Sequence, residues 1–296
     1  MLLADALASI RRLEDDGLAF EILVGDNGNS EATARVIAEF GADRIPVTLR
    51  GASAARNGAM RKATGDFIAF LDDDDVWLPG HLKSHIALMQ ADPTVGAVLG
   101  QVCNASADLS TTSDPWPTEL APRPRLFRQM LGFYPQIGAT IIRATTLPAV
   151  GYFDESLASD EDWDWHLRLA TATTVGFVAT PCVLFRQRPL TGGDLEWRRM
   201  KYNRKVLWMN VRRQPHLGVA LGALRAVAKH RGGYAHQFAR EAGAEYARRS
   251  RSGARVNILR SLIASPPHAI VALYQHAATR RALAAFVPTR NSKGAH

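Results

Sequence analysis

The feature that most constrains this chain is a short apolar segment that ends in four consecutive aspartates. Residues 67–71 read Phe-Ile-Ala-Phe-Leu, and aspartates occupy positions 72–75. An apolar run between polar residues is typical of a buried strand in a parallel sheet. Open α/β sheets bind their ligands beyond the carboxyl ends of the strands, which is where these aspartates would lie. The segment therefore predicts a strand that carries carboxylates into a binding site.

Four adjacent carboxylates repel one another, so a position at the end of a buried strand is costly unless a cation is near. Carboxylate oxygens suit a hard divalent ion such as Mg²⁺ or Mn²⁺, and such an ion commonly bridges to phosphate groups. The alternative is a solvated acidic loop that binds nothing. The apolar strand before the aspartates and Trp77-Leu78-Pro79 after them favour the metal site.

Segments of strand and helix character alternate through the first part of the chain. We expect strands at 20–25, 45–49, 67–71, 95–102, 138–143, 174–179 and 182–186, and helices at 2–13, 31–40, 53–64, 81–90 and 166–170. This alternation predicts an α/β fold with a mostly parallel, Rossmann-like sheet flanked by helices. Beyond residue 190 helical patterns dominate, and Pro266-Pro267 predicts a break between two of those helices.

Charge divides the chain into two parts. Residues 1–185 contain 14 Lys and Arg against 24 Asp and Glu, a net charge of −10, whereas residues 186–296 contain 22 against 4, a net charge of +18. The asymmetry predicts an acidic domain of residues 1–190 followed by a basic helical region of residues 191–296.

The cellular setting follows from what the sequence contains. Its two cysteines, Cys103 and Cys182, are too few for a disulfide framework and indicate a reducing compartment. We expect no signal peptide and no spanning helix, because no window offers 18 apolar residues without charge. A cytoplasmic protein is the expectation.

Four motifs occur in a fixed order in the first part of the chain. They are residues 22–30 (ILVGDNGNS), residues 55–58 with 63–66 (ARNG and ATGD), residues 70–75 (FLDDDD), and residues 151–155 leading to 161–162 (GYFDE and ED). Together they resemble the family 2 glycosyltransferases of the GT-A fold over roughly residues 1–190. The resemblance implies an enzyme that moves a sugar, with inversion, from a nucleotide-sugar donor to a glycan or lipid-linked acceptor.

The resemblance also assigns roles on the donor side. Asp26 and Asn27 would lie near the nucleotide base, Arg56 near the nucleotide, Asp73 or Asp72 near the ribose, and Asp74 with help from Asp72 at a Mn²⁺ or Mg²⁺ ion. Arg188 stands where many relatives have a histidine. An arginine cannot bind metal there, but it could hold a phosphate group.

An acceptor hydroxyl has a very high pKa, so a carboxylate must take its proton as attack proceeds. We expect Asp162 to be that base, with Glu161 as the second choice. Trp163 and Trp165 could offer a flat apolar platform to an acceptor sugar, or they could belong to the core, and the sequence leaves both interpretations open.

One departure from the family concerns its first strand. Relatives open with an apolar strand that ends in a Pro-Thr-Tyr-like turn at the nucleotide base, whereas residues 1–13 here already resemble the following helix. That strand usually lies between those expected at 20–25 and 67–71, so we expect a gap or a rearranged pairing. The departure supports a second hypothesis, a catalytically weak GT-A-like scaffold that binds a partner or an anionic surface.

The basic region combines Arg and Lys clusters with apolar helical stretches. Basic amphipathic helices fit association with anionic lipid. Nucleic-acid binding and a plain solvated face are the rival interpretations. Because many relatives act on lipid-linked acceptors, we expect peripheral association with the inner face of a membrane and no nucleic-acid partner.

Overall fold

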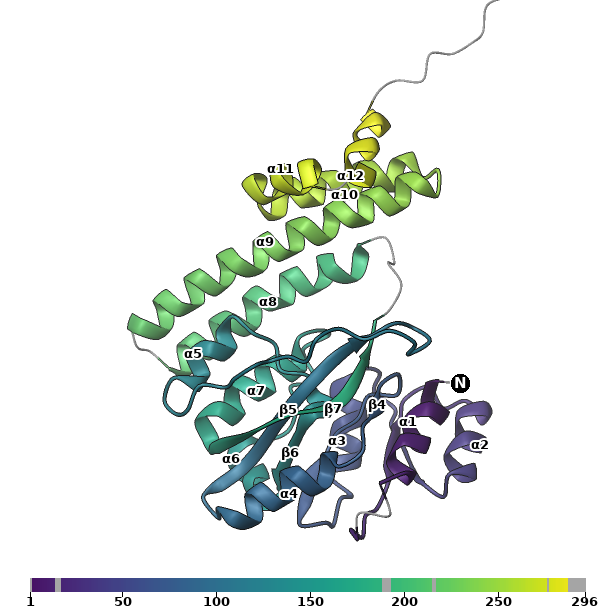
Figure 1. The fold of residues 1–296 in the computed structure, drawn as a ribbon, viewed down its shortest axis with the longest axis vertical. Coiled ribbons are helices and arrows are strands. Elements are labelled where there is room, and N and C mark those ends of the chain that lie inside the picture. The colour runs from purple at the N-terminus through teal and green to yellow at the C-terminus, as the bar shows by residue number, and fades with distance from the viewer. Residues whose placement is uncertain (1, 14–16, 188–192, 215–216, 276, 287–296) are drawn as a thin grey trace, which may run out of the picture. The chain divides into compact units, whose positions relative to one another are not determined.

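The computed structural model describes residues 2–13, 17–187, 193–214, 217–275 and 277–286 (Figure 1). The chain forms two compact units, one of Met1–Arg188 with Val206–Pro215 and one of Pro189–Lys205 with His216–His296. Helix α8 (Asp194–Arg213) contributes to both, since residues 194–205 belong to the second unit and residues 206–213 to the first.

The first unit alternates strands and helices, as the sequence predicts. Its strands are β1 (Leu23–Asp26), β2 (Asp43–Pro46), β3 (Phe67–Ala69), β4 (Val76–Trp77), β5 (Val95–Ala105), β6 (Thr140–Arg143) and β7 (Thr174–Arg186). Its helices are α1 (Leu2–Arg11), α2 (Glu31–Glu39), α3 (Ala52–Met60), α4 (His81–Ala91), α5 (Leu126–Leu131), α6 (Leu147–Val150) and α7 (Glu161–Ala172), with 3-10 turns η2 (Ile137–Ala139) and η3 (Ala144–Thr146). The two strands expected at 174–179 and 182–186 form the single strand β7.

The larger sheet has the strand order β3-β6-β5-β7-β4. Strands β5 and β7 pair in parallel, while β3 with β6, β6 with β5, and β4 with β7 pair antiparallel. The α/β class is confirmed, but the sheet is mixed rather than mostly parallel. Sequence patterns do not give the relative direction of paired strands, because a buried apolar run looks the same in a parallel and in an antiparallel pair.

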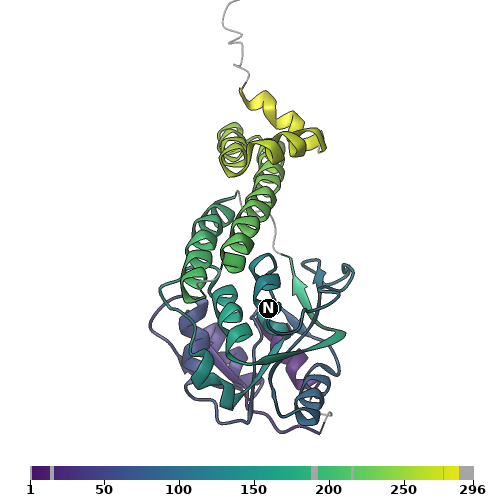
Figure 2. The same ribbon diagram turned by 90° about the vertical axis from the view of Figure 1, so that its left-hand side faces the viewer.

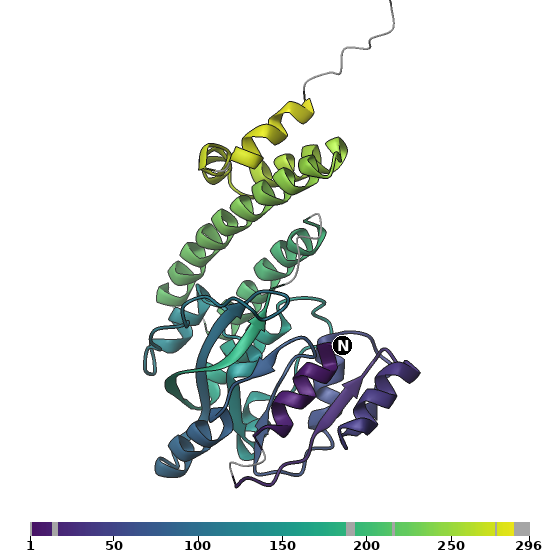
Figure 3. The same cartoon turned by 45° about the vertical axis from the view of Figure 1, so that its right-hand side comes forward.

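Strands β1 and β2 form a separate parallel sheet, which Figures 1 and 3 show in purple beside α1 and α2. Within the described ranges, no ladder joins this sheet to β3. A side chain links them instead: Glu21 Oε1 accepts the N–H groups of Thr64 and Gly65 at 2.6 and 3.1 Å, just before β3. The gap expected between the two segments is therefore present.

Both faces of the larger sheet are covered by helices. Val98 of β5 joins a core that includes Met89 of α4, whereas its neighbour Ala97 joins a core that includes Trp165 and Leu169 of α7. Successive side chains of a strand point to opposite faces, so one strand supports both cores. The expectation of helices on both faces is thus confirmed.

The second unit is helical. Its helices are the first part of α8, the long α9 (Leu217–Ala247), α10 (Arg251–Ala264), α11 (Pro266–Gln275) and α12 (Ala277–Ala282), followed by the 3-10 turn η4 (Leu283–Phe286). Figure 2 shows α10 to α12 gathered around the C-terminal end of α9, where Ala242 packs with Ala254, Ile258 and Ala282. The predicted break falls at Pro266, which begins α11. None of the described helices is long and apolar enough to cross a membrane.

Candidate active site

Helix α3 is held close to the end of β1, and this contact places the first two motifs side by side. A Cβ on Gly25 would overlap the backbone of Ala55, so only a glycine permits this approach. Small residues on α3 make the same contact possible from the other side. The close packing positions the next residue of the helix, Arg56, beyond the carboxyl end of the strand.

Arg56 joins two acidic segments that are far apart in the sequence. Its Nη2 donates to Asp72 Oδ1 at 2.5 Å and its Nη1 donates to Glu161 Oε1 at 2.9 Å, while the guanidinium carbon lies 5.3 Å from the centre of the Phe153 ring. Only 13% of the side chain is exposed. Burial lowers the pKa of Arg56, but the charges of Asp72, Glu161 and Asp162 raise it above its ordinary value overall. The arginine therefore stays charged and balances the cluster.

The neighbouring residue, Asn57, fixes the fourth motif against α3. Its amide nitrogen donates to the Phe153 carbonyl at 2.9 Å and to Glu155 Oε1 at 2.8 Å, and its amide oxygen accepts the Phe153 N–H at 2.9 Å. Asn57 is 1% exposed. These three bonds satisfy a buried amide and tie α3 to the segment that precedes α7.

The four aspartates occupy different environments. Asp72 is partly exposed and Asp73 is exposed, whereas Asp74 and Asp75 are buried. Asp75 accepts the Arg186 N–H at 2.9 Å and the Gln136 side-chain N–H at 2.6 Å, so it has a structural role. Carbonyl and carboxylate groups around Arg186, including the Asp74 carbonyl at 2.8 Å, hold the end of β7 against the aspartate loop.

The chemistry of this loop fits a hard divalent ion. Asp74 is 7% exposed at the end of an apolar strand, and Asp72 lies two residues before it. A buried carboxylate is an oxygen ligand of the kind that Mn²⁺ and Mg²⁺ prefer. These two residues could therefore hold the ion expected from the sequence.

Asp26, expected at the nucleotide base, organises its own loop. Its Oδ1 accepts the N–H groups of Gly28 and Asn29 at 3.0 and 2.9 Å, and its Oδ2 accepts Arg44 Nε at 2.8 Å. Asn27 donates to the Gly51 carbonyl at 2.9 Å. A carboxylate oxygen can accept more than one hydrogen bond, so Asp26 retains capacity for a ligand while it shapes the loop.

The two candidate bases begin helix α7. Burial, and next the charge of Asp162, raise the pKa of Glu161, while Arg56 lowers it. Asp162 Oδ1 accepts the Trp163 N–H at 2.8 Å, and among the described residues its second oxygen makes no hydrogen bond. Glu161 is thus tied to Arg56, and Asp162 keeps one oxygen for another partner.

The aromatic residues that follow are core residues in this structure. Trp163 and Trp165 are fully buried, and their indole N–H groups donate to the carbonyls of Met130 and Gly151 at 2.7 and 2.9 Å. Of the two interpretations left open by the sequence, these contacts favour packing over an acceptor platform. His166 is buried between the Asp162 carbonyl and Thr140 Oγ1, both at 2.8 Å, and burial lowers its pKa to about 3.

The sequence did not predict a buried network of hydrogen bonds that includes residues of α7. Asp164, fully buried, accepts Arg168 Nε at 2.9 Å, Asn210 Nδ2 at 2.9 Å and Arg213 Nη1 at 2.7 Å. Arg168 also donates to the Tyr152 carbonyl at 2.9 Å, so the network supports both parts of the fourth motif. Only the spacing of Asp164 and Arg168, four residues apart on a helix, could have indicated it. Arg188, expected at the donor phosphates, lies outside the described residues.

Comparison with protein families supports the resemblance. Residues 2–142 match the profile of "Glycosyl transferase family 2". Among curated relatives, the Escherichia coli UDP-Glc:alpha-D-GlcNAc-diphosphoundecaprenol beta-1,3-glucosyltransferase WfgD is 40% identical over 74 residues, which is 24% of this chain and 29% of the relative. The uncharacterized glycosyltransferase YwdF of Bacillus subtilis is 25% identical over 171 residues, 55% of this chain and 62% of the relative. The chain thus spans less than two thirds of the length of either relative.

Solved structures share the fold. Staphylococcus aureus TarS superposes with a TM-score of 0.56 at 14% identity, covering 93% of this chain and 52% of TarS. The mannosyltransferase PcManGT from Pyrobaculum calidifontis, solved with GDP-Man and Mn²⁺, superposes with a TM-score of 0.55 at 19% identity, covering 96% of this chain and 81% of that protein. The GT-A fold and the resemblance to family 2 glycosyltransferases are confirmed.

The ion pair between Arg56 and Glu161 predicts how the pKa of Glu161 responds to substitution. In Arg56→Met the pKa of Glu161 should rise further, because the cation that lowers it is gone while burial and Asp162 remain. A carboxyl group whose pKa is raised by folding favours the folded state at low pH, and that contribution is lost as pH rises through the raised pKa. The stability of Arg56→Met should therefore fall more steeply than that of the wild type above about pH 4.5.

Carboxyl-carbon NMR titration would measure this pKa, with Glu161→Gln used to assign the signal. Arg61→Met is the matched control, since Arg61 directly follows the same helix but is exposed and contacts Glu155 at 3.4 Å. An unchanged or lower pKa for Glu161 in Arg56→Met would show that the ion pair does not control this carboxyl group.

Proposed function

From the match of residues 2–142 to family 2 glycosyltransferases, we propose that this chain transfers a sugar from a nucleotide-sugar donor to a glycan or lipid-linked acceptor, with inversion and with a divalent metal ion. The observation that carries the proposal is the bridge made by Arg56, which joins the aspartate loop after β3 to the acidic start of α7. These segments are the ones expected to carry donor and base chemistry. They meet beyond the carboxyl end of β3, and α/β proteins bind ligands beyond the carboxyl ends of their strands.

On the donor side we propose Asp26 and Asn27 at the base, Arg56 near the nucleotide, Asp72 or Asp73 at the ribose and Arg188 at the phosphates. When bound by Asp74 and Asp72, Mn²⁺ or Mg²⁺ would neutralise charge on the diphosphate leaving group. The buried Asp74 carboxylate supports this assignment. TarS solved with UDP-GlcNAc and PcManGT solved with GDP-Man and Mn²⁺ have the same fold and support the class of donor.

On the acceptor side we propose Asp162 as general base. Its second oxygen makes no hydrogen bond within the described part of the chain, whereas Glu161 is held by Arg56. The raised pKa of Glu161 would favour proton uptake there, but its ion pair would have to break first. For the acceptor, the α-D-GlcNAc-diphosphoundecaprenol in the name of WfgD makes a diphosphate-linked lipid sugar the first class to test.

The proposal predicts that Asp74→Ala loses Mn²⁺-dependent affinity for nucleotide. Binding of UDP and GDP, measured by calorimetry with and without Mn²⁺, should weaken by at least about tenfold, or ~1.4 kcal/mol, in the presence of the metal. Asp66→Ala, an exposed aspartate before the same strand, is the matched control and should bind as the wild type does. Equal affinities for all three proteins would remove Asp74 from the metal site.

The same proteins separate the enzyme from the scaffold hypothesis. A transferase releases nucleoside diphosphate from its nucleotide sugar in the presence of a diphosphate-linked lipid sugar, whereas a scaffold binds nucleotide weakly or not at all and releases none. A panel of UDP- and GDP-sugars with Mn²⁺ covers the donors carried by the two structural neighbours.

Asp162→Asn should lower turnover by about 10²-fold or more with little change in donor affinity, because an amide cannot take the acceptor proton. Steady-state kinetics with the acceptor that gives turnover would measure this loss, and Glu161→Gln is the comparison. Normal turnover in Asp162→Asn together with a large loss in Glu161→Gln would transfer the role of base to Glu161.

We further propose that the second unit binds anionic membrane surfaces. Leu217, Leu221 and Leu224 of α9 are 78, 48 and 61% exposed, and their spacing places them on one helix face. Leu259 and Ile263 of α10 are also more than half exposed. Apolar faces on a region with a net charge of +18 suit shallow insertion combined with electrostatic attraction.

The full chain should therefore sediment with vesicles that contain anionic lipid and dissociate from them as salt rises, since attraction decays within about 8 Å at physiological ionic strength. A double substitution, Leu221→Ser with Leu224→Ser, should weaken binding, whereas Leu49→Ser, which is 51% exposed in the first unit, should not. Binding that survives high salt and the double substitution would place the contact elsewhere, and preference for DNA at matched salt would favour the nucleic-acid interpretation.

A further inference from the structure

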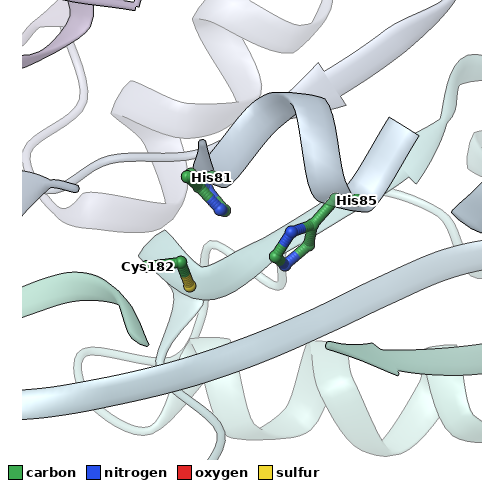
Figure 4. Close-up of side chains that lie close together, drawn as sticks. All are labelled: His81, His85 and Cys182. Carbon is green, nitrogen blue, oxygen red and sulfur yellow. The ribbon is translucent and has the colours of Figure 1, made fainter. Parts of the chain in front are cut away.

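A second cluster of side chains that can bind metal lies in the core of the first unit. In the sequence its residues come after β4, whereas the aspartates come before it. It consists of His81 and His85 on α4 and Cys182 on β7. Two histidines four residues apart lie on the same face of a helix. Figure 4 shows both imidazoles and the thiol directed into one space between the helix and the strand. Their ligand atoms all lie within 4.8 Å of one another.

All three residues are buried, with 0 to 2% of each exposed. Among the described residues, both ring nitrogens of His81 and the Nε2 of His85 have no hydrogen-bond partner, although the carbonyls of Gly138 and Ala139 are near enough to affect the pKa values of the two rings. Buried polar atoms without partners are rare in proteins, because leaving them unpaired is unfavourable. The surrounding core contains residues such as Trp77 and Val183, whose side chains provide no hydrogen-bond acceptor for these nitrogens.

The surroundings of His85 resemble those of a metal ligand. Ser84 Oγ donates to the His81 carbonyl at 3.0 Å and lies 3.3 Å from His85 Nδ1. With the serine hydrogen directed at the His81 carbonyl, the tautomer of His85 that fits this contact donates from Nδ1 to the serine oxygen. That tautomer has its lone pair on Nε2, the atom directed toward the cluster. Histidines that bind metal typically donate their other ring N–H to a nearby oxygen in this way.

Gly100 allows strand β5 to pass close to these atoms. A Cβ at position 100 would overlap the Cys182 sulfur and lie 2.8 Å from His85 Nε2, so only a glycine fits beside the cluster. Burial lowers the pKa of both imidazoles, to about 4 for His85, so both are in the neutral form that binds metal. The Cys182 thiol lies 3.1 Å from the Gln101 carbonyl oxygen and donates to it, and a metal would replace its proton.

We propose that His81, His85 and Cys182 form a structural site for Zn²⁺. Two imidazoles and a thiolate are ligands that zinc prefers, whereas Mn²⁺ and Mg²⁺ prefer the oxygens of the aspartate loop. Zinc bonds of about 2.0–2.3 Å place ligand atoms roughly 3.3–3.8 Å apart, so the three side chains would draw together by about 1 Å. The Gln101 carbonyl is a further oxygen close to the sulfur.

The site lies where an ion would stabilise the aspartate loop. Strand β4, which connects the aspartates to α4, pairs with β7 through Trp77 and Val183, and Leu78 N–H donates to the Cys182 carbonyl at 2.9 Å. Zinc would join the start of α4 to the same point of β7. The segment that runs from the aspartates through β4 to α4 would then be held to β7 by the strand pairing and by zinc, independently of any ion that Asp74 binds.

The test is the metal content of the full chain, purified without a polyhistidine tag and without chelator. Mass spectrometry of the metals should find about one zinc per chain, and Cys182→Ser and His85→Gln should lower this by roughly tenfold or more. Cys103→Ser is the matched control, since Cys103 is buried on the neighbouring strand β5 and is not part of the cluster. Asp74→Ala should retain its zinc.

A second measurement applies if Cys182→Ser or His85→Gln does not fold. Chain loaded with Co²⁺ in place of zinc should show a thiolate-to-cobalt charge-transfer band, and Cys103→Ser should keep it, because Cys182 is then the sole cysteine. Absence of stoichiometric zinc in the wild type together with absence of this band would overturn the proposal. Zinc retained in a folded Cys182→Ser, or lost in Asp74→Ala alone, would do the same.

Discussion

The arrangement of the first unit depends on the charge balance around Arg56. Carboxylates that converge from two segments of the chain repel one another strongly in a partly dry environment, and one delocalised cation with a fork of donors can hold a carboxylate on each side. The guanidinium is mostly buried and also lies over Phe153, so its position is set by packing as well as by charge. Because Gly25 allows α3 to approach β1, the same helix delivers both this arginine and the Asn57 clamp.

A second set of buried charged side chains lies beneath the candidate active site. Asp75 accepts hydrogen bonds from Gln136 and Arg186, and Asp164 accepts them from Arg168, Asn210 and Arg213. The acidic residues of a cluster thus form two groups. Some would contact a ligand, and the others hold neighbouring residues in place. A carboxylate that replaces water with several protein donors is stable without a ligand, which is why such residues are easily mistaken for catalytic ones.

Sequence patterns predicted the elements well and their pairing less well. The segment 67–71, the helix after Pro79 and the break at Pro266 all occur as expected, because each rests on local rules of periodicity or proline geometry. The antiparallel insertion of β6 and the ties of Asp164 to Asn210 and Arg213 depend on contacts between distant segments, which local patterns do not encode. For the candidate site, the motifs selected Asp72, Arg56 and Glu161, which the structure brings into contact, but they could not show that Trp163 and Trp165 are core residues or that His81 and His85 face Cys182.

The division between the two sheets has a consequence for how the first unit opens. Strands β1 and β2 pair over only four residues each and share no backbone ladder with β3 in the described ranges, so Glu21, packing against α1 and α2, and the close approach of α3 to β1 carry the connection. Small elements of this kind commonly unfold locally while the rest of a protein stays native, and their amide hydrogens then exchange faster than those of β5 and β7. A nucleotide that contacted both the loop after β1 and the loop after β3 would bind only the closed form. Ligand binding would thus slow amide exchange in strands that the ligand does not contact.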